Sequence, residues 1–239
     1  MPIPPICPLE SKRFVLVLTC TLAIALLAAI GIHAQQLQPG ISVQMAVTTN
    51  AQPVPAADDP DAWVVAITAD GRLYFGTKQL TPEALTEQMQ ATPRRRDQNL
   101  YIKADARAPY AGLRKVLEAA KENLFDAPVL LTVEHEPVQP GVLVPPKGLE
   151  ILLTEPAPGS EAAVVRIRGT GKEPPTVEVN SRPIARGKLE ASLIARLQNQ
   201  SERFVLLKAD VQLPFAQLAE VIDTCRAAGA KVILPAPEL

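Results

Sequence analysis

An internal repeat limits the folds open to this chain more than any other feature. The run Tyr101–Asp105 and the pair Pro109–Tyr110 return 105 residues later as Leu206–Asp210 and Pro214–Phe215. An apolar helical pattern follows each pair: Leu113, Val116, Leu117 and Ala120 in the first copy, and Leu218, Val221, Ile222 and Cys225 in the second. Each copy of such a repeat is one supersecondary unit. The sequence therefore predicts two tandem modules of roughly 70 to 75 residues, a size at which many domains fold.

A single apolar segment precedes the two modules. Phe14–Ile32 contains 19 residues without a charge, close to the roughly 20 that a helix needs to cross a bilayer. Lys12 and Arg13 lie before this segment, and the first charge after it is Asp58. The positive-inside rule therefore places the N-terminus in the cytoplasm and the modules on the far side of the membrane.

The alternative is a secretory signal that is cleaved. The tripeptide His33-Ala34-Gln35 resembles a small-residue cleavage site, and the residues before the apolar segment are basic. The apolar region of a signal peptide usually spans about 7 to 15 residues, so the longer segment here favours a retained anchor. Both alternatives place the modules outside the cytoplasm.

Each module shows the same order of expected elements. In the first module, strands at 63–67 and 73–75 flank an Asp70–Gly71 hairpin turn, and further strands are expected at 99–103 and 128–133. Helices are expected after Thr81 and from Pro109. The second module repeats this order with strands at 164–167, 176–179, 204–207 and 232–234 and helices at 189–197 and 214–227. The predicted fold class is α+β, with two ββαβαβ domains whose mixed sheets carry helices on one face.

Two proline-rich connections each contain one more strand pattern. Gly40–Met45 alternates apolar and polar side chains, and Gly148–Leu153 begins in the same order. Strands are therefore predicted at 40–45 and 148–153. The predicted organisation is a cytoplasmic tail at 1–13, a transmembrane helix at 14–34, a tether at 35–61, a domain at 62–134, a linker at 135–162 and a second domain at 163–239.

The composition argues against catalysis, metal binding and nucleic acid binding. The 24 basic and 25 acidic residues give a net charge of -1, so no charge excess points to a nucleic acid partner. Cys7, Cys20 and Cys225 form no close pair and have no metal-binding spacing, and the two histidines, His33 and His135, lie far apart. We expect no enzymatic activity, no cofactor, no metal and no disulfide.

Two aspartates and one arginine cluster are the remaining candidates for functional residues. Asp105 and Asp210 follow a strand and precede a helix, but no histidine, serine or second carboxylate recurs beside both, so we expect Asx-type turns. Arg94, Arg95 and Arg96 are candidate contacts for an anionic polymer or a lipid phosphate. The alternative is a solvated loop, because the second module has uncharged residues in much of the matching segment.

Several segments together match the plan of one family. They are the Gly40–Met45 pattern, Ile67–Tyr74, Ile102–Asp105, Pro109–Tyr110 and Val116–Ala120. With the single apolar segment and the proline-rich tether, this pattern resembles the ExbD/TolR family of biopolymer transport proteins. The resemblance implies a single-pass protein of the bacterial inner membrane with a periplasmic domain, acting in a TonB- or Tol-like energy-transducing complex. It also implies an ExbB/TolQ-like multi-span partner, and further a TonB/TolA-like protein and peptidoglycan as candidate partners.

Two features depart from the family plan. The exported module is duplicated, so either a homodimer or an intramolecular pseudo-dimer is expected. Family members that use the proton motive force carry an aspartate in the membrane helix, whereas the matching position here lies near Thr21. Threonine does not titrate near neutral pH, so this helix is expected to lack a proton relay. The resemblance therefore implies an accessory transport subunit; the alternative is a periplasmic module that binds peptidoglycan or a partner protein after signal cleavage.

Overall fold

The computed structural model describes residues 40–95, 97–134, 144–154, 161–169 and 174–235. Within the chain, Gln38–Leu239 form one compact unit. The predicted tail at 1–13, the predicted transmembrane helix at 14–34 and Thr21 lie outside the described residues. No helix in the described part of the chain is long and apolar enough to cross a bilayer. The domain boundaries given above stay predictions.

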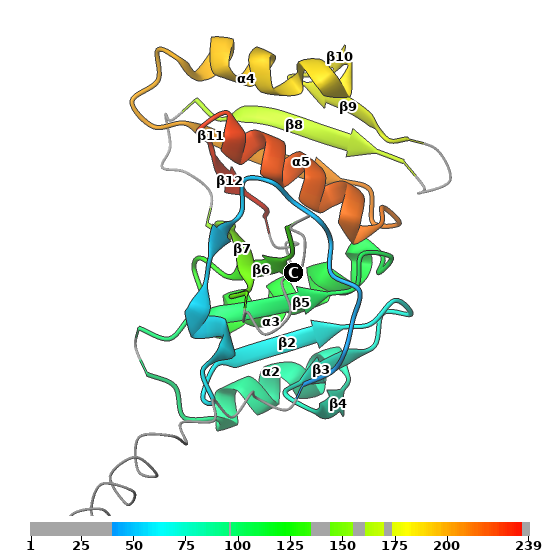
Figure 1. The fold of residues 1–239 in the computed structure, drawn as a ribbon, viewed down its shortest axis with the longest axis vertical. Coiled ribbons are helices and arrows are strands. Elements are labelled where there is room, and N and C mark those ends of the chain that lie inside the picture. The colour runs from blue at the N-terminus through cyan, green and yellow to red at the C-terminus, as the bar shows by residue number, and fades with distance from the viewer. Residues whose placement is uncertain (1–39, 96, 135–143, 155–160, 170–173, 236–239) are drawn as a thin grey trace, which may run out of the picture. The chain divides into compact units, whose positions relative to one another are not determined.

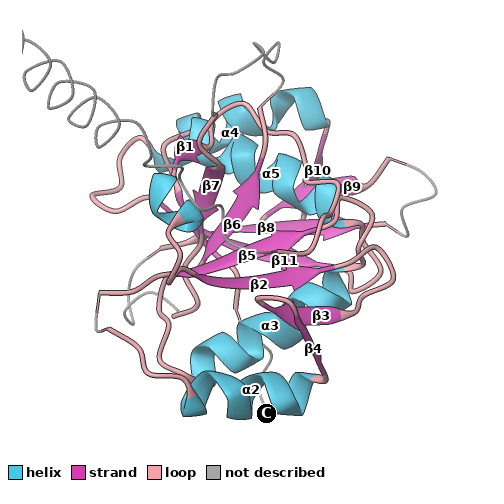
Figure 2. Cartoon of the chain, turned by 60° about the horizontal axis from the view of Figure 1, so that its bottom comes forward, coloured by secondary structure: helices cyan, strands magenta, loops and turns pink. Residues whose placement is uncertain are grey.

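The first module is built on a mixed sheet (Figure 1). Its elements are β2 (Trp63–Ile67), β3 (Leu73–Phe75), β4 (Lys78–Leu80), α2 (Pro82–Ala91), β5 (Leu100–Ala104), α3 (Tyr110–Glu122) and β6 (Val129–Thr132). β2, β5 and β6 pair in parallel, whereas β3 and β4 extend the sheet antiparallel. α2 and α3 lie together against one face of this sheet (Figure 2).

Segments from outside the first module complete its sheet. These are β1 (Gln52–Pro53), which precedes the short 3-10 helix η1 (Pro55–Asp58), and β7 (Lys147–Glu150). β7 pairs antiparallel with β6, and β1 pairs antiparallel with β7. The resulting order is β1-β7-β6-β5-β2-β3-β4 in a seven-stranded sheet. The chain that leads into the second module therefore belongs to the sheet of the first.

The second module has a five-stranded sheet of the same design. Its elements are β8 (Ala163–Arg168), β9 (Thr176–Val179), β10 (Arg182–Ile184), η2 (Arg186–Lys188), α4 (Leu189–Leu197), β11 (Phe204–Ala209), α5 (Phe215–Ala227) and β12 (Lys231–Ile233). The strand order is β10-β9-β8-β11-β12, in which β8, β11 and β12 are parallel. The mixed sheets expected from the repeat are thus confirmed in both modules.

Local sequence signals explain where these elements begin and pack. The hydroxyl of Thr81 accepts a hydrogen bond of 3.2 Å from the backbone N–H of Ala84 and so caps α2, as predicted. Gly71 has a φ of 81°, the left-handed conformation that the hairpin turn between β2 and β3 requires. The apolar face predicted for the helix after Pro109 is buried, with Val116 and Leu117 fully inaccessible.

Three expectations about strands were wrong or incomplete. Each module contains a short third strand, β4 or β10, so its order is βββαβαβ; three residues are too few for a period-two pattern to be recognised. The strand predicted at 40–45 does not form a ladder: Met45 makes one isolated bridge, to Asp105, and Val47, beyond the predicted strand, makes another, to Val133. The pattern at 148–153 corresponds to β7 and a single parallel bridge between Leu152 and Ile233 of β12.

Candidate functional site

The loops that precede α3 and α5 pair with each other. Pro109 and Pro214 form an antiparallel bridge. The backbone N–H of Tyr110 donates to the carbonyl of Leu213 at 2.8 Å, and the N–H of Phe215 donates to the carbonyl of Ala108 at 2.8 Å. Tyr110 and Phe215 are equivalent positions of the repeat, and so are Ala108 and Leu213. The second hydrogen bond is therefore the equivalent of the first, with the two modules exchanged.

A second pair of hydrogen bonds repeats this symmetry. Ala111 N–H donates to the carbonyl of Val211 at 2.8 Å, and Ala216 N–H donates to the carbonyl of Ala106 at 2.9 Å. The same surface of each module therefore contacts its counterpart, which is the pattern of an isologous two-fold interface. Within this one chain, the modules contact each other as a pseudo-dimer.

The interface satisfies backbone groups that a helix cannot satisfy by itself. The first N–H groups of any α-helix have no intrahelical acceptor, and neither Pro109 nor Pro214 supplies a side-chain cap. Each module's loop carbonyls accept the first N–H groups of the other module's helix instead. Tyr110 and Phe215 are 4% and 1% exposed, as expected for core anchors, and burial raises the pKa of Tyr110 to about 12.

Asp223 on α5 binds the N-terminal segment that passes beside this helix (Figure 1). Its carboxylate accepts hydrogen bonds from the backbone N–H groups of Thr49 at 3.0 Å and Asn50 at 2.8 Å. The Thr49 hydroxyl and the Asn50 side-chain amide also donate to it, each at 3.0 Å. Asp223 is 6% exposed, so this carboxylate is buried against the segment that it binds. The matching residue of α3 is Glu118.

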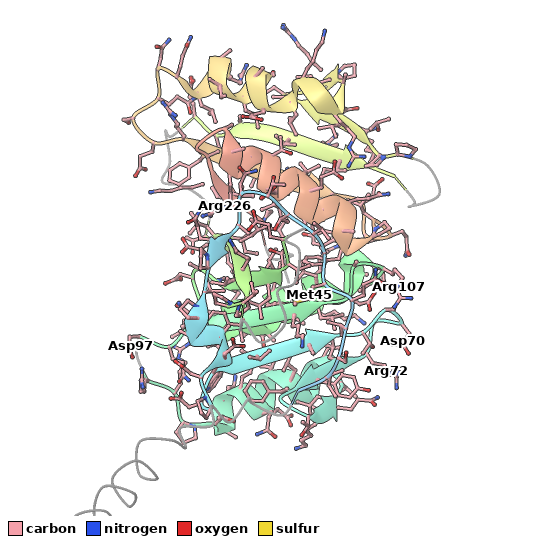
Figure 3. All side chains as sticks on the ribbon, in the orientation of Figure 1. Met45, Asp70, Arg72, Asp97, Arg107 and Arg226 are labelled. Carbon is pink, nitrogen blue, oxygen red and sulfur yellow. The ribbon has the colours of Figure 1, made fainter. Side chains whose placement is uncertain are left out.

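Asp105 plays a similar role in the first module. Its buried carboxylate accepts from Arg107 Nε at 2.9 Å, Arg107 Nη2 at 3.1 Å and the backbone N–H of Gln44 at 3.1 Å. Hydrogen bonding to Arg107 lowers the pKa of Asp105 from 3.8 to about 2, against the opposing effect of burial. Figure 3 labels Arg107 and Met45, the residue of the N-terminal segment that bridges to Asp105. Asp105 thus fixes this segment to the first module.

The Asx turn predicted at both aspartates forms at one of them. Asp105 Oδ1 accepts from the backbone N–H of Arg107 at 3.0 Å, two residues along the chain, which confirms the prediction there. Asp210 is exposed, and its Oδ2 accepts from the N–H of Gly169 at 3.1 Å, so it contacts the loop after β8 instead. The two aspartates therefore make matching backbone hydrogen bonds, but their side chains have different partners.

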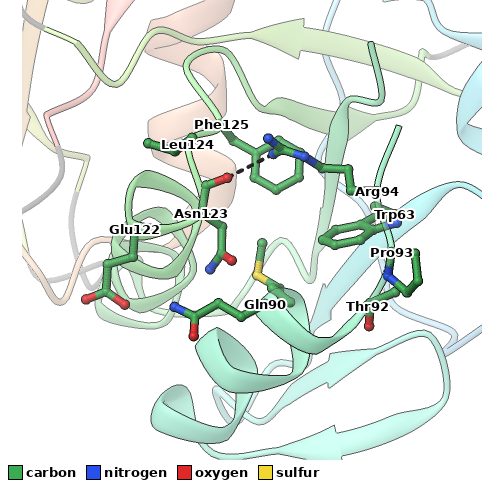
Figure 4. Close-up of a pocket in the computed structure, with 10 residues that line it drawn as sticks. Trp63, Gln90, Thr92, Pro93, Arg94, Glu122, Asn123, Leu124 and Phe125 are labelled. Carbon is green, nitrogen blue, oxygen red and sulfur yellow. Dashed lines mark hydrogen bonds between the residues drawn. The ribbon is translucent and has the colours of Figure 1, made fainter. Parts of the chain in front are cut away.

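A pocket of about 400 Å³ lies where α2 and α3 end (Figure 4). Its floor is apolar, and amide, hydroxyl and charged groups surround it. The lining residues are Trp63, Met89, Gln90, Thr92, Pro93, Arg94, Glu122, Asn123, Leu124 and Phe125. Trp63 packs against Phe125 with ring centroids 5.6 Å apart.

The structure separates the residues of the predicted arginine cluster. Arg94 enters the pocket: its guanidinium carbon lies 4.2 Å from the centroid of the Phe125 ring, and Nη1 donates to the Asn123 carbonyl at 2.9 Å. Arg95 forms ion pairs with Asp61 at 3.6 Å and with Asp97, labelled in Figure 3, at 3.5 Å. Arg96 lies outside the described residues. Of the described pair, Arg94 is therefore the one placed to contact a ligand in this pocket.

Sequence reasoning missed Leu124, the residue at the edge of the pocket. This leucine is 78% exposed and has a φ of 58°, whereas the matching residue of the second module, Gly229, has a φ of 75°. When the two copies of the repeat are aligned, Leu124 matches Gly229 directly after a predicted helix, where glycine is the usual residue. This mismatch is the sequence signal that could have identified Leu124. Asp223 against Glu118 is a second signal of the same kind.

The described residues give binding geometry rather than reaction chemistry. Among them, no group of three histidine, cysteine or carboxylate side chains is arranged to hold a metal ion. Cys225 is buried, which raises its pKa to about 12 and leaves the thiol protonated near neutral pH. The described residues show two modules in contact, an N-terminal segment hydrogen-bonded to both of them, and a pocket in the first module that Arg94 enters.

Comparison with known proteins identifies the two copies with one family. The family model described as "Biopolymer transport protein ExbD/TolR" matches residues 17–135 and matches again over 140–236. The two matches correspond to the two copies of the repeat and together span most of the chain. No curated protein is similar enough to count as a match.

Proposed function

This chain belongs to the ExbD/TolR family of biopolymer transport proteins, and we propose that it is a membrane-anchored, accessory subunit of a TonB- or Tol-like energy-transducing complex. The family consists of transport proteins rather than enzymes. The single observation that carries the proposal is the double match to this family, in one chain that also contains one uncharged segment of membrane-spanning length, Phe14–Ile32.

The proposed location is the bacterial inner membrane. Lys12 and Arg13 on one side of the apolar segment favour a cytoplasmic N-terminus, with both modules in the periplasm. The family match begins at residue 17, inside this segment, which supports an anchor that is retained. The natural partner of such a helix is an ExbB/TolQ-like multi-span protein, and the periplasmic modules are available to a TonB/TolA-like protein or to peptidoglycan.

The accessory role follows from the chemistry of the apolar segment. Phe14–Ile32 contains no aspartate, glutamate, histidine, lysine or arginine, and Thr21 lies near the position where proton-driven relatives carry an aspartate. A threonine hydroxyl cannot take up and release protons at neutral pH. We infer that a second, proton-competent family member supplies the relay, while this chain contributes its paired modules.

The test is to purify the full chain from membranes in a mild detergent, determine its mature N-terminus and identify the proteins that co-purify. An intact N-terminus together with a multi-span ExbB/TolQ-like protein is the expected result. Cleavage after Ala34 without a membrane partner would overturn the proposal and favour a released periplasmic binding module. As a control for the accessory role, Thr21→Val should leave proton-driven work by the complex unchanged, because it removes only the hydroxyl.

A further inference from the structure

The last helices of the two modules end with the same backbone motif. After α3, Phe125 N–H donates to the carbonyl of Ala120 at 3.0 Å; after α5, Ala230 N–H donates to the carbonyl of Cys225 at 3.1 Å. This motif requires a left-handed residue directly after the helix cap, a position that glycine occupies most readily. The second module has Gly229 there, and the first has Leu124.

The fold requires a left-handed residue at position 124, but it does not require a leucine there. Its β-carbon makes the left-handed conformation unfavourable, as it does for any non-glycine residue. Packing offers no compensation, since the side chain is 78% exposed. Strained residues that persist without a structural gain point to a functional surface. Leu124 lies at the edge of the pocket between α2 and α3.

The pocket floor is suited to an apolar side chain. Trp63, Met89 and Phe125 are 5%, 2% and 7% exposed, and they form its inner wall. The volume of about 400 Å³ lies in the range of clefts that bind ligands. Arg94 already covers a face of the Phe125 ring, so that face is not open for stacking by a sugar ring. The exposed aliphatic group at the edge, Leu124, favours contact with another aliphatic or aromatic side chain.

The charged group at the edge is suited to a carboxylate. The position of the Arg94 guanidinium is fixed by Phe125 beneath it and by the Asn123 carbonyl, which binds Nη1. A guanidinium presents five N–H donors in a planar fork that matches a carboxylate. Glu122 also lines the pocket and disfavours a second acidic group on the ligand. The charge pattern therefore selects one carboxylate next to the apolar group.

We propose that this pocket is a docking site for a peptide segment of a partner protein, in which an apolar side chain is adjacent to an aspartate or glutamate. The site belongs to the first module alone, because Gly229 and Ala230 replace Leu124 and Phe125 in the second. The proposal goes beyond the proposed function, since it does not depend on the anchor or on proton-driven work.

The single tryptophan of the chain makes the site directly measurable. Trp63 is the only tryptophan and lines the pocket, so its fluorescence reports occupancy without a label. The probes are acetylated dipeptide amides that pair Leu, Ile, Val, Met or Phe with Asp, in both orders, and matched amides with Asn in place of Asp. They are titrated into the full chain in detergent up to their solubility limits. A saturable change in Trp63 fluorescence is expected with at least one Asp probe, and its Asn counterpart is expected to bind about tenfold more weakly.

Three variants separate binding from folding. Arg94→Gln is expected to weaken the best Asp probe about tenfold, while Arg95→Gln, which removes an arginine outside the pocket, leaves it unchanged. Leu124→Gly is expected to weaken the probe and to raise the melting temperature by about 2 °C, because glycine relieves the strained backbone. A purely structural role for Leu124 predicts a lower melting temperature instead.

Two results would overturn the proposal. One is the absence of saturable binding by every Asp probe to a chain whose melting curve is normal. The other is equal binding by Asp and Asn probes that survives Arg94→Gln, which indicates general apolar adsorption. Vesicles containing an anionic lipid serve as a comparison: a response to vesicles without a response to any peptide assigns the arginine to a membrane surface. None of these outcomes depends on which membrane protein co-purifies.

Discussion

Asp105 in the first module is buried beneath Arg107 and the N-terminal segment, whereas Asp210 at the matching place in the second module is exposed. The helices that follow show the reverse difference. In α5 the buried Asp223 binds Thr49 and Asn50, while α3 has the half-exposed Glu118 there. The N-terminal segment is thus fixed to the first module by one aspartate and to the second by another. The duplicated modules kept a common core and divided the surface roles between them.

A second difference concerns the pockets of the two modules. The first module has a pocket with Arg94 above Phe125 and with Leu124 at its edge. In the second module, Gly229 takes the place of Leu124 and Ala230 takes the place of Phe125. The second module forms a smaller pocket of about 260 Å³ elsewhere, lined by η2, the start of α4 and α5. Arg186 and Glu220 both line this pocket and form an ion pair of 2.5 Å. Two copies of one fold therefore have different surfaces.

The largest expected effect tests whether the two modules unfold together. Leu193 is fully buried in α4, and Leu193→Ala should cost about 3 kcal/mol of unfolding free energy. Trp63 lies in the first module, so its fluorescence reports the unfolding of that module. If the two modules unfold together, the unfolding free energy measured by Trp63 fluorescence in urea should fall by the same amount as that measured by far-UV circular dichroism. Ile194→Ala is the matched control on the same helix, at a residue that is 45% exposed, and it should cost far less. If Leu193→Ala leaves the urea unfolding transition of Trp63 fluorescence unchanged, the modules fold independently.

The next effect tests the contact between α5 and the N-terminal segment. Asp223→Ala removes a buried carboxylate that accepts from two backbone N–H groups and two side chains, and should cost about 2.5 kcal/mol. Amide hydrogen exchange at Thr49 and Asn50 should become faster in the same variant. Glu118→Ala changes the matching residue of α3 and should have little effect on either quantity. Equal losses in both variants would remove the distinction between the helices.

The pH dependence of stability tests the difference between Asp105 and Asp210. The pKa of Asp105 is lowered from 3.8 to about 2, so its ionised form stabilises the folded state by about 2 kcal/mol. This stabilisation is complete above about pH 4 and is lost as the pH falls through about 2. Asp105→Asn should therefore be destabilising at pH 6 and nearly neutral at pH 2, whereas Asp210→Asn should change stability little at either pH. The measurement is the unfolding free energy from chemical denaturation at pH 6 and pH 2. If Asp105→Asn lowered this free energy equally at both pH values, the stabilisation would not come from the ionised carboxylate of Asp105.

The smallest effect tests the backbone strain at the edge of the pocket. Leu124→Gly should stabilise the chain by about 1 kcal/mol, because glycine accepts the left-handed conformation. The reciprocal change, Gly229→Leu, should destabilise it by at least as much, since a β-carbon at Gly229 would lie 3.2 Å from Arg203 Nη1. Differential scanning calorimetry on both variants measures the two signs. The same sign for both changes would show that the modules do not differ at this position.

The repeat predicted much of the fold but little of how its copies contact each other. Helix α2 with its Thr81 cap and the buried face of α3 followed from local patterns, because caps and helical periodicity are local in sequence. The pairing of Tyr110 with Leu213 joins residues 103 positions apart and uses backbone atoms, which carry no residue-specific signal. The pairing of β7, which lies in the predicted linker, with β6 of the first module was missed, because a strand pattern does not identify its partner strand.

The candidate site shows the same limit. The arginine cluster was visible in sequence, but the position of Arg94 in the pocket depends on where α3 ends. The ion pairs of Arg95 depend on Asp61 and Asp97. In the sequence, Leu124 differs from its surroundings only because it matches a glycine in the aligned repeat. The structure adds that Leu124 is exposed and has a left-handed backbone, which the sequence does not reveal.

The pairing of the two modules within one chain is tested directly by one cross-link. Pro109 and Pro214 face each other across the bridge as a non-hydrogen-bonded pair, whose α-carbons typically lie about 4.5 Å apart, within the range that a disulfide spans. The measurement is oxidation of Pro109→Cys/Pro214→Cys in a chain whose Cys7, Cys20 and Cys225 are replaced, followed by non-reducing electrophoresis. An intrachain disulfide at the mass of one chain is predicted. A disulfide-linked dimer, or no cross-link at all, would contradict the intramolecular pseudo-dimer.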